Sequence, residues 1–197
     1  MDAVLAAFQK YVAQGGYVMP PLIGAALVLW YALGYRIALL WRGGNARPRE
    51  LIETFERQAS LMPTNAVEEA VRLGAAIRAS HPGRIDRVLE HRFVEVTQPL
   101  NRFRILVKSI VAIAPLLGLL GTVSGMIETF AALGDMTLFS QSGGIAGGIS
   151  QALLTTQFGL SIAIPGLVMG RFLERRQRNL EALIEEVKSI LVARAHS

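Results

Sequence analysis

The polar side chains inside the apolar runs of the C-terminal half of the chain include Thr122, Gln151, Thr155, Thr156 and Gln157. Their hydroxyl and amide groups can donate and accept hydrogen bonds, but they do not titrate near neutral pH. Because hydrocarbon leaves a polar group unsatisfied, such side chains usually turn toward a protein or water-filled interior. The residues therefore favour a polar pathway. If the chain moves protons, a partner must supply the titratable group, since Glu128 lies only near the outer end of its run.

The sequence contains no motif of enzyme catalysis. His81, His91 and His196 have spacings that make no zinc site, and we expect each to be a solvated surface residue. The glycines of residues 114–126 form no phosphate loop, because no strand precedes them. With no cysteine, the chain offers no thiol chemistry. We therefore expect no enzymatic activity, no metal and no cofactor.

The elements that hold these polar side chains are expected to be membrane-spanning helices. The chain has 197 residues, of which 52% are hydrophobic, and its mean hydropathy is +0.40. That composition is typical of an all-α membrane protein with few spans. Three apolar segments are long enough to cross a hydrocarbon core of roughly 30 Å. They are residues 17–41, which open at Pro20-Pro21 and contain Arg36, residues 105–134, and residues 145–173.

Four further segments flank or connect the three spans. We expect residues 1–16 to form an amphipathic helix on the outer face, with a frayed tail as the alternative. In residues 42–104 basic and acidic side chains alternate, which predicts a cytoplasmic helical insertion that faces water and anionic membrane lipids, not nucleic acid. We also expect residues 135–144 to form a periplasmic turn and residues 174–197 to form a cytoplasmic C-terminal helix.

Three helices are predicted within the cytoplasmic insertion, at residues 49–60, 65–79 and 83–98. Thr64 or Asn65 is expected to cap the second helix, because both residue types accept hydrogen bonds from a first helical turn. The apolar positions repeat at helical spacing and would form a small core. This predicted core contains Leu51, Phe55, Val67, Val71, Ile85, Leu89 and Phe93.

The positions of the basic residues predict the orientation of the chain. Of 20 Lys and Arg residues, only Lys10 precedes the first span, and the turn at residues 135–144 has none. Cytoplasmic flanks of membrane proteins carry the excess of positive charge. We therefore expect the N-terminus outside and the C-terminus in the cytoplasm.

Small residues form a stripe on each of the last two spans. In lipid, such residues let helix backbones approach closely, which drives helix association. Two such stripes can pack together, or they can line an axis when several copies form a ring. For any one threonine, the alternative is a hydrogen bond to its own helix. The stripes contain Gly118, Gly121, Thr122 and Gly125, then Gly148, Ala152, Thr156, Gly159 and Ala163, with Gln151 and Thr155 on the adjoining edge and prolines at Pro115 and Pro165.

Two runs resemble the motifs of the MotA/TolQ/ExbB proton channel family. The run from Ala114 to Val123 is similar to the second-span motif of that family. The run from Gln151 to Thr156, followed by Gly159-Leu160 and Ala163-Ile164-Pro165, is similar to the third-span motif. Both occur in the expected order, so the resemblance covers essentially the whole chain. The short length, single insertion and three spans resemble ExbB or TolQ more than the four-span flagellar stator subunit.

The resemblance implies a ring of five subunits in the bacterial inner membrane, around the transmembrane helices of two ExbD-type partner chains. Those partner helices carry an aspartate that takes up and releases protons. Thr122 and Thr156 match the ring threonines that face this aspartate, with Gln151 and Thr155 on the same pathway. The resulting motion would pass through a TonB-type protein to receptors for uptake in the outer membrane.

Gln151 departs from the family pattern, because ExbB and TolQ relatives often carry glutamate there. Glutamine keeps the reach of glutamate but cannot titrate. The partner aspartate would then carry the proton, or Gln151 would only stabilise the ring by bonding a neighbouring chain. Two other interpretations stay open: a passive scaffold that orients the partner subunits, and a TolQ-type energiser of the Tol-Pal envelope system.

Overall fold

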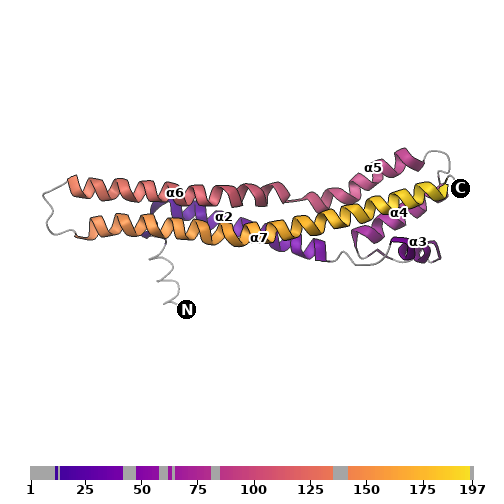
Figure 1. Cartoon of the computed structure of the whole chain (residues 1–197), viewed down its shortest axis with the longest axis horizontal. Coiled ribbons are helices and arrows are strands. Elements are labelled where there is room, and N and C mark those ends of the chain that lie inside the picture. The colour runs from indigo at the N-terminus through magenta and orange to yellow at the C-terminus, as the bar shows by residue number, and fades with distance from the viewer. Residues whose placement is uncertain are drawn as a thin grey trace. The chain divides into compact units, whose positions relative to one another are not determined.

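The computed structural model describes residues 12, 14–41, 48–57, 62–63, 65–80, 85–134 and 142–195. All regular structure in these residues is helical (Figure 1), which confirms the predicted all-α class. Three helical segments are long and apolar enough to cross a membrane, as predicted. They lie at Gly16–Trp41, Leu89–Gly134 and Gly144–Ala193.

Contacts between residues divide the chain into two units. Unit 1 combines Met1–Leu33 with Ile105–Gly170, and unit 2 combines Gly34–Arg104 with Arg171–Ser197. Most of the predicted outer-face helix, residues 1–16, lies outside the described residues, as does the first part of the predicted turn at residues 135–144.

Unit 1 is built from the short helix η1 (Gly16–Val18) and from residues of α2 (Met19–Trp41), α6 (Arg104–Gly134) and α7 (Ser142–Ala195). Prolines at positions 20 and 21 fall in the first turn of α2, where a missing N–H costs nothing. Gly16, just before α2, has a φ of 61°, a conformation that glycine adopts without steric cost. The chain therefore bends where the predicted first span begins.

Helices α6 and α7 lie side by side and antiparallel within unit 1 (Figure 1). Positions further along α6 contact positions that come earlier in α7: Gly118 meets Gly159, whereas Gly125 meets Gly148. At a rise of about 1.5 Å per residue, the 31 residues of α6 extend roughly 46 Å, which exceeds a hydrocarbon core of roughly 30 Å. Helix α6 must therefore tilt in a membrane or project beyond it.

Helix α7 is a single helix of 54 residues that contains both the predicted third span and most of the predicted C-terminal helix. Pro165 lies inside it without ending it. The described residues at positions 173 and 174, where the predicted span meets the predicted cytoplasmic helix, are both helical.

Unit 2 contains three short helices, α3 (Pro48–Arg57), α4 (Ala66–Ser80) and α5 (Ile85–Thr97), followed by η2 (Gln98–Asn101). Helix α3 packs on α4, and α4 packs on α5. Of the predicted core, Leu51 is only part-buried, because the neighbouring Ile52 occupies the buried position, and the Ile85 side chain lies outside the described residues. The remaining five are buried: Phe55, Val67, Val71, Leu89 and Phe93.

Asn65 caps the N-terminus of α4, which confirms one of the two predicted caps. The Glu68 N–H donates to Asn65 Oδ1 at 2.9 Å, and Asn65 Nδ2 donates to Glu68 Oε1 at 2.8 Å. The asparagine side chain therefore accepts a hydrogen bond from a backbone N–H that has no partner within the first turn of the helix. The glutamate side chain in turn accepts a hydrogen bond from the asparagine amide.

Candidate functional site

Glycines set the contact between α6 and α7. An added Cβ on Gly118 would lie 3.0 Å from the Thr155 carbonyl oxygen and 3.1 Å from the Thr156 Cα. An added Cβ on Gly159 would lie 2.7 Å from the Ala114 carbonyl oxygen. These distances leave no room for a side chain, so the two backbones themselves form the contact.

The same contact continues along the helix pair at three further glycines. A methyl group on Gly121 would overlap the side chain of Thr155. An added Cβ on Gly125 would meet the Gly148 carbonyl oxygen, and one on Gly148 would meet both the Thr129 hydroxyl and the Gly125 carbonyl oxygen. All five glycines that the sequence proposes for packing therefore lie between α6 and α7.

Pro115 and Pro165 lie inside α6 and α7, and both are part-buried. Proline has no N–H, so the carbonyl groups of Val111 and Ser161, four residues earlier, lose their usual helical donor. Next to Pro165, an added Cβ on Gly166 would lie 2.8 Å from a Val111 methyl carbon. The helices thus remain in close contact around their proline residues.

Thr122 and Thr156 are the two pathway threonines that keep part of their surface accessible. The Thr122 hydroxyl donates to the Leu119 carbonyl oxygen at 2.6 Å. The Thr156 hydroxyl lies 3.1 Å from the Ala152 carbonyl oxygen and 3.3 Å from that of Gly118 across the helix pair. In an α-helix the Gly118 carbonyl also accepts the Thr122 N–H, so this one carbonyl connects the two threonines.

Thr155 lies inside the helix pair. It is 0% exposed, and its hydroxyl donates within its own helix to the Gln151 carbonyl oxygen at 2.9 Å. The hydroxyl group fills the space that Gly121 leaves open. In the single chain Thr155 is therefore a packing residue, and its place on a proton pathway stays a prediction.

Gln151 is buried and contacts a carboxylate of the same chain. Gln151 is 6% exposed, and its Nε2 donates to Glu128 Oε1 on α6 at 3.2 Å. Glu128 itself is exposed. Sequence reasoning noted Glu128 but did not assign it to the site. A carboxylate within an apolar run does indicate a functional residue. Helical spacing alone, however, cannot identify the partner of Glu128 on another helix.

A second polar cluster lies in unit 2 and was not predicted. Arg36 of α2 is 1% exposed, and its Nη2 donates to Gln177 Oε1 of α7 at 2.6 Å. Gln177 Nε2 in turn donates to Asn101 Oδ1 at 2.7 Å and to Glu181 Oε1 at 2.8 Å. A charge inside a predicted span was the sequence signal, since a buried charge needs polar partners. The cluster joins α2, η2 and α7.

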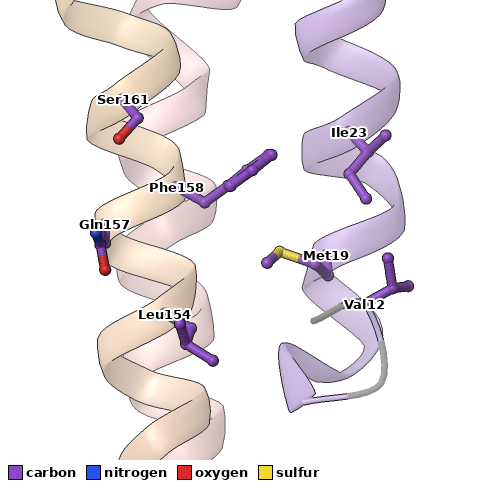
Figure 2. Close-up of a pocket in the computed structure, with 7 residues that line it drawn as sticks. All are labelled: Val12, Met19, Ile23, Leu154, Gln157, Phe158 and Ser161. Atoms are coloured by element: carbon purple, nitrogen blue, oxygen red, sulfur yellow. The ribbon is translucent and has the colours of Figure 1, made fainter. Parts of the chain in front are cut away.

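A cavity of about 370 Å³ lies between α2 and α7 in unit 1 (Figure 2). Phe158 points from α7 toward α2, where Met19 and Ile23 line the opposite wall. Two polar side chains, Gln157 and Ser161, also line the cavity. Its walls are otherwise apolar, and it lies on the side of α7 that faces α2, away from the glycine contact.

No metal site is evident in the part of the chain that the structure describes, where no three His, Cys, Asp or Glu side chains cluster. His91 is an exposed residue of α5. His81 and His196 lie outside the described residues.

Residues 58–186 match the family described as the MotA/TolQ/ExbB proton channel family. The chain belongs to this family. Among its relatives is an ExbB-like biopolymer transport protein (ExbB-like 3) of Synechocystis, 29% identical over an alignment of 184 residues that covers 87% of each chain. The biopolymer transport protein ExbB of Salmonella typhimurium is 33% identical over 99 residues, which are 50% of this chain and 40% of that protein.

The match to the MotA/TolQ/ExbB family contains α4, α5, α6 and most of α7. It therefore includes the glycine contact, the four predicted pathway residues and Glu128. Helix α2, with Arg36, lies outside the matched range. The match to this family thus includes the helix pair that holds the candidate site.

Proposed function

We propose that this chain is the ring subunit of an inner-membrane complex that converts the proton-motive force into work. Five copies would surround the transmembrane helices of two ExbD-type partners, and the motion would pass to a TonB-type protein for uptake across the outer membrane. The chain itself would catalyse no covalent reaction. The observation that carries the proposal is the pair of partly exposed threonines, Thr122 and Thr156, on the helix pair of a proton channel family.

The threonines would act as hydrogen-bond acceptors. Both hydroxyl protons already point to backbone carbonyl groups, so the lone pairs of the hydroxyl oxygens stay available. A protonated partner aspartate can donate to such an oxygen, whereas an ionised one cannot. The ring would then favour the neutral partner carboxyl, and transfer of the proton inward would release about 2.3 kcal/mol per charge for each 100 mV.

Replacing Thr122 and Thr156 with valine tests this role. Loss of two hydrogen-bond acceptors, at about 1 kcal/mol each, should slow proton flux by about tenfold or more in liposomes that contain the complex. Thr129→Val is the matched control, because Thr129 is also a threonine of α6 bonded to its own helix, at Gly125 O. Unchanged flux in an assembled double variant would contradict the proposal.

The ring itself can be tested by native mass spectrometry of the purified complex. We expect a mass that corresponds to five copies of this chain with two copies of the partner. The exposed apolar side chains of α6 support assembly, because they include Leu116, Leu119, Val123, Ile127 and Phe130 along most of the helix. A chain that stays monomeric in mild detergent and in lipid would argue against a ring.

A passive scaffold is the second candidate, and one observation favours it. The hydroxyls of Thr122, Thr155 and Thr156 are all satisfied by backbone carbonyl groups, as expected for residues that only pack. Proton flux distinguishes the ring subunit of a proton channel from a passive scaffold. A scaffold would conduct no protons, even in a complex that still transmits energy to a TonB-type partner. A TolQ-type role would share the mechanism and differ only in the client.

A further inference from the structure

Glu128 is the only acidic side chain among the described residues of unit 1. It lies on α6 midway between Thr122 and Gly134, six residues from each, or about 9 Å along the axis at about 1.5 Å per residue. An ionisable group within a membrane span is costly to place there, so its presence indicates a function.

The contact with Gln151 gives Glu128 a defined position. Gln151 is buried, and its amide lies against Gly16, where an added Cβ would sit 2.8 Å from the amide carbon. Gly16 also has a φ of 61°. A side chain at this position would therefore be disfavoured both by the contact with Gln151 and by the backbone conformation. The short helix η1 and helix α7 thus fix a hydrogen-bond donor, and this donor contacts an exposed carboxylate on α6.

We infer that Glu128 is a proton-binding group of this chain and that Gln151 is its positioning residue. The inference rests on the proposed function and adds a carboxylate of the ring subunit to that of the partner. A hydronium ion on the outer side would transfer a proton to a Glu128 carboxylate oxygen, leaving one water and a neutral carboxyl group. The carboxyl group would then pass the proton to the next water toward Thr122, which restores the carboxylate. Only O–H bonds form and break.

Few charged groups face Glu128 from the elements around it. The described residues of α7 in unit 1 contain no titratable side chain, and η1 contributes only the exposed Tyr17. On α6 itself, Lys108 lies twenty residues away, or about 30 Å along the axis. The polar group that contacts the Glu128 carboxylate is therefore the neutral Gln151 amide. This amide can bond the ionised or the neutral carboxyl group, because it both donates and accepts hydrogen bonds.

Two variants isolate the titration of Glu128. Glu128→Gln keeps the size and the hydrogen bonding but cannot bind a proton at neutral pH. The exchange variant Glu128→Gln with Gln151→Glu moves the carboxylate to the other side of the same contact. Glu90→Gln is the matched control, because it removes an exposed carboxylate from α5, in unit 2.

The first measurement is infrared spectroscopy of the full chain in lipid during an acid titration. We expect the wild type, the Glu90→Gln control and the exchange variant to gain a carboxyl band that is missing from Glu128→Gln. Identical titrations of wild type and Glu128→Gln would overturn the inference. This readout needs no partner and no flux, so it stands even if the proposed function fails.

The second measurement is proton flux in liposomes with the ExbD-type partner, as a function of the pH on the outer side. In Glu128→Gln we expect flux to fall by about tenfold or more, the factor that about 1.4 kcal/mol of barrier produces, and to lose its dependence on outer pH. The exchange variant should recover that dependence. Wild-type flux and pH profile in Glu128→Gln would overturn the inference, whereas absence of flux in the wild type would overturn the proposed function instead.

Discussion

At the scale of single residues, a threonine hydroxyl in this protein has two separate roles. The Thr155 hydroxyl is fully buried and fills the space over Gly121, so it shapes the contact between the helices. Those of Thr122 and Thr156 keep exposed surface, although each donates to a carbonyl group of its own helix. Accessibility, not hydrogen bonding, therefore separates a residue that can meet a partner from one that cannot.

Arg36 makes a residue-scale prediction about stability. Arg36→Ala removes the donor to Gln177 Oε1 and leaves a buried acceptor unsatisfied. Since a hydrogen bond to a charged group contributes about 1.5 to 3 kcal/mol, the midpoint of thermal unfolding in detergent should fall clearly. Arg178→Ala, at an exposed position of α7, serves as the control and should leave the midpoint nearly unchanged. Equal midpoints for the two variants would contradict the role of the cluster.

The Asn65 cap makes a second prediction at this scale. Asn65→Ala removes the acceptor for the Glu68 N–H, and loss of such a cap costs about 1 kcal/mol. Hydrogen exchange should therefore speed up in the first turn of α4, by about fivefold if the turn opens locally. Asn179→Ala, at an exposed position of α7, should not change exchange in α4. Protection that stays the same in Asn65→Ala would contradict the capping role.

At the scale of elements, adjacent glycines of α7 differ in what surrounds them. An added Cβ on Gly148 would collide with the Gly125 carbonyl oxygen and the Thr129 hydroxyl, whereas nothing lies near an added Cβ on Gly147. Gly148→Ala should thus destabilise the chain by about 1 to 3 kcal/mol, the usual cost of overpacking. Gly147→Ala should be neutral or stabilise by up to about 1 kcal/mol, because alanine favours helices.

These two glycine variants can be compared by thermal unfolding in the same detergent. They differ by one position and make the same chemical change, so any difference between them reports the helix contact. A Gly148→Ala chain as stable as Gly147→Ala would mean that α6 and α7 do not pack as described.

The positions of the elements could be predicted from the sequence because apolar runs and capping residues are local signals. The three span-length helices and the Asn65 cap follow from such signals. The pairing of Gln151 with Glu128 and of Arg36 with Gln177 could not be predicted, since the partners are 23 and 141 residues apart. Periodicity places a side chain on one face of its own helix, but it does not identify the residue across from it.

At the scale of the whole molecule, the orientation in the membrane is open to a direct test. The chain has no cysteine, so a single introduced cysteine reports its own location. We expect Gln14→Cys to react with a membrane-impermeant thiol reagent in cells whose inner membrane is intact, and Glu90→Cys to react only after lysis. Both positions are exposed in the structure. The opposite pattern would reverse the orientation that the basic residues predict.

The glycine contact between α6 and α7 has one more consequence for a protein that handles protons. Where backbone lies directly on backbone, as at Gly118, Gly125 and Gly159, no file of water molecules fits between the two helices. Ions therefore have no water-filled path between α6 and α7 at these glycines. A larger residue at any of these glycines would force the two backbones apart, and we expect such a variant to raise the resting proton leak of liposomes that contain the complex.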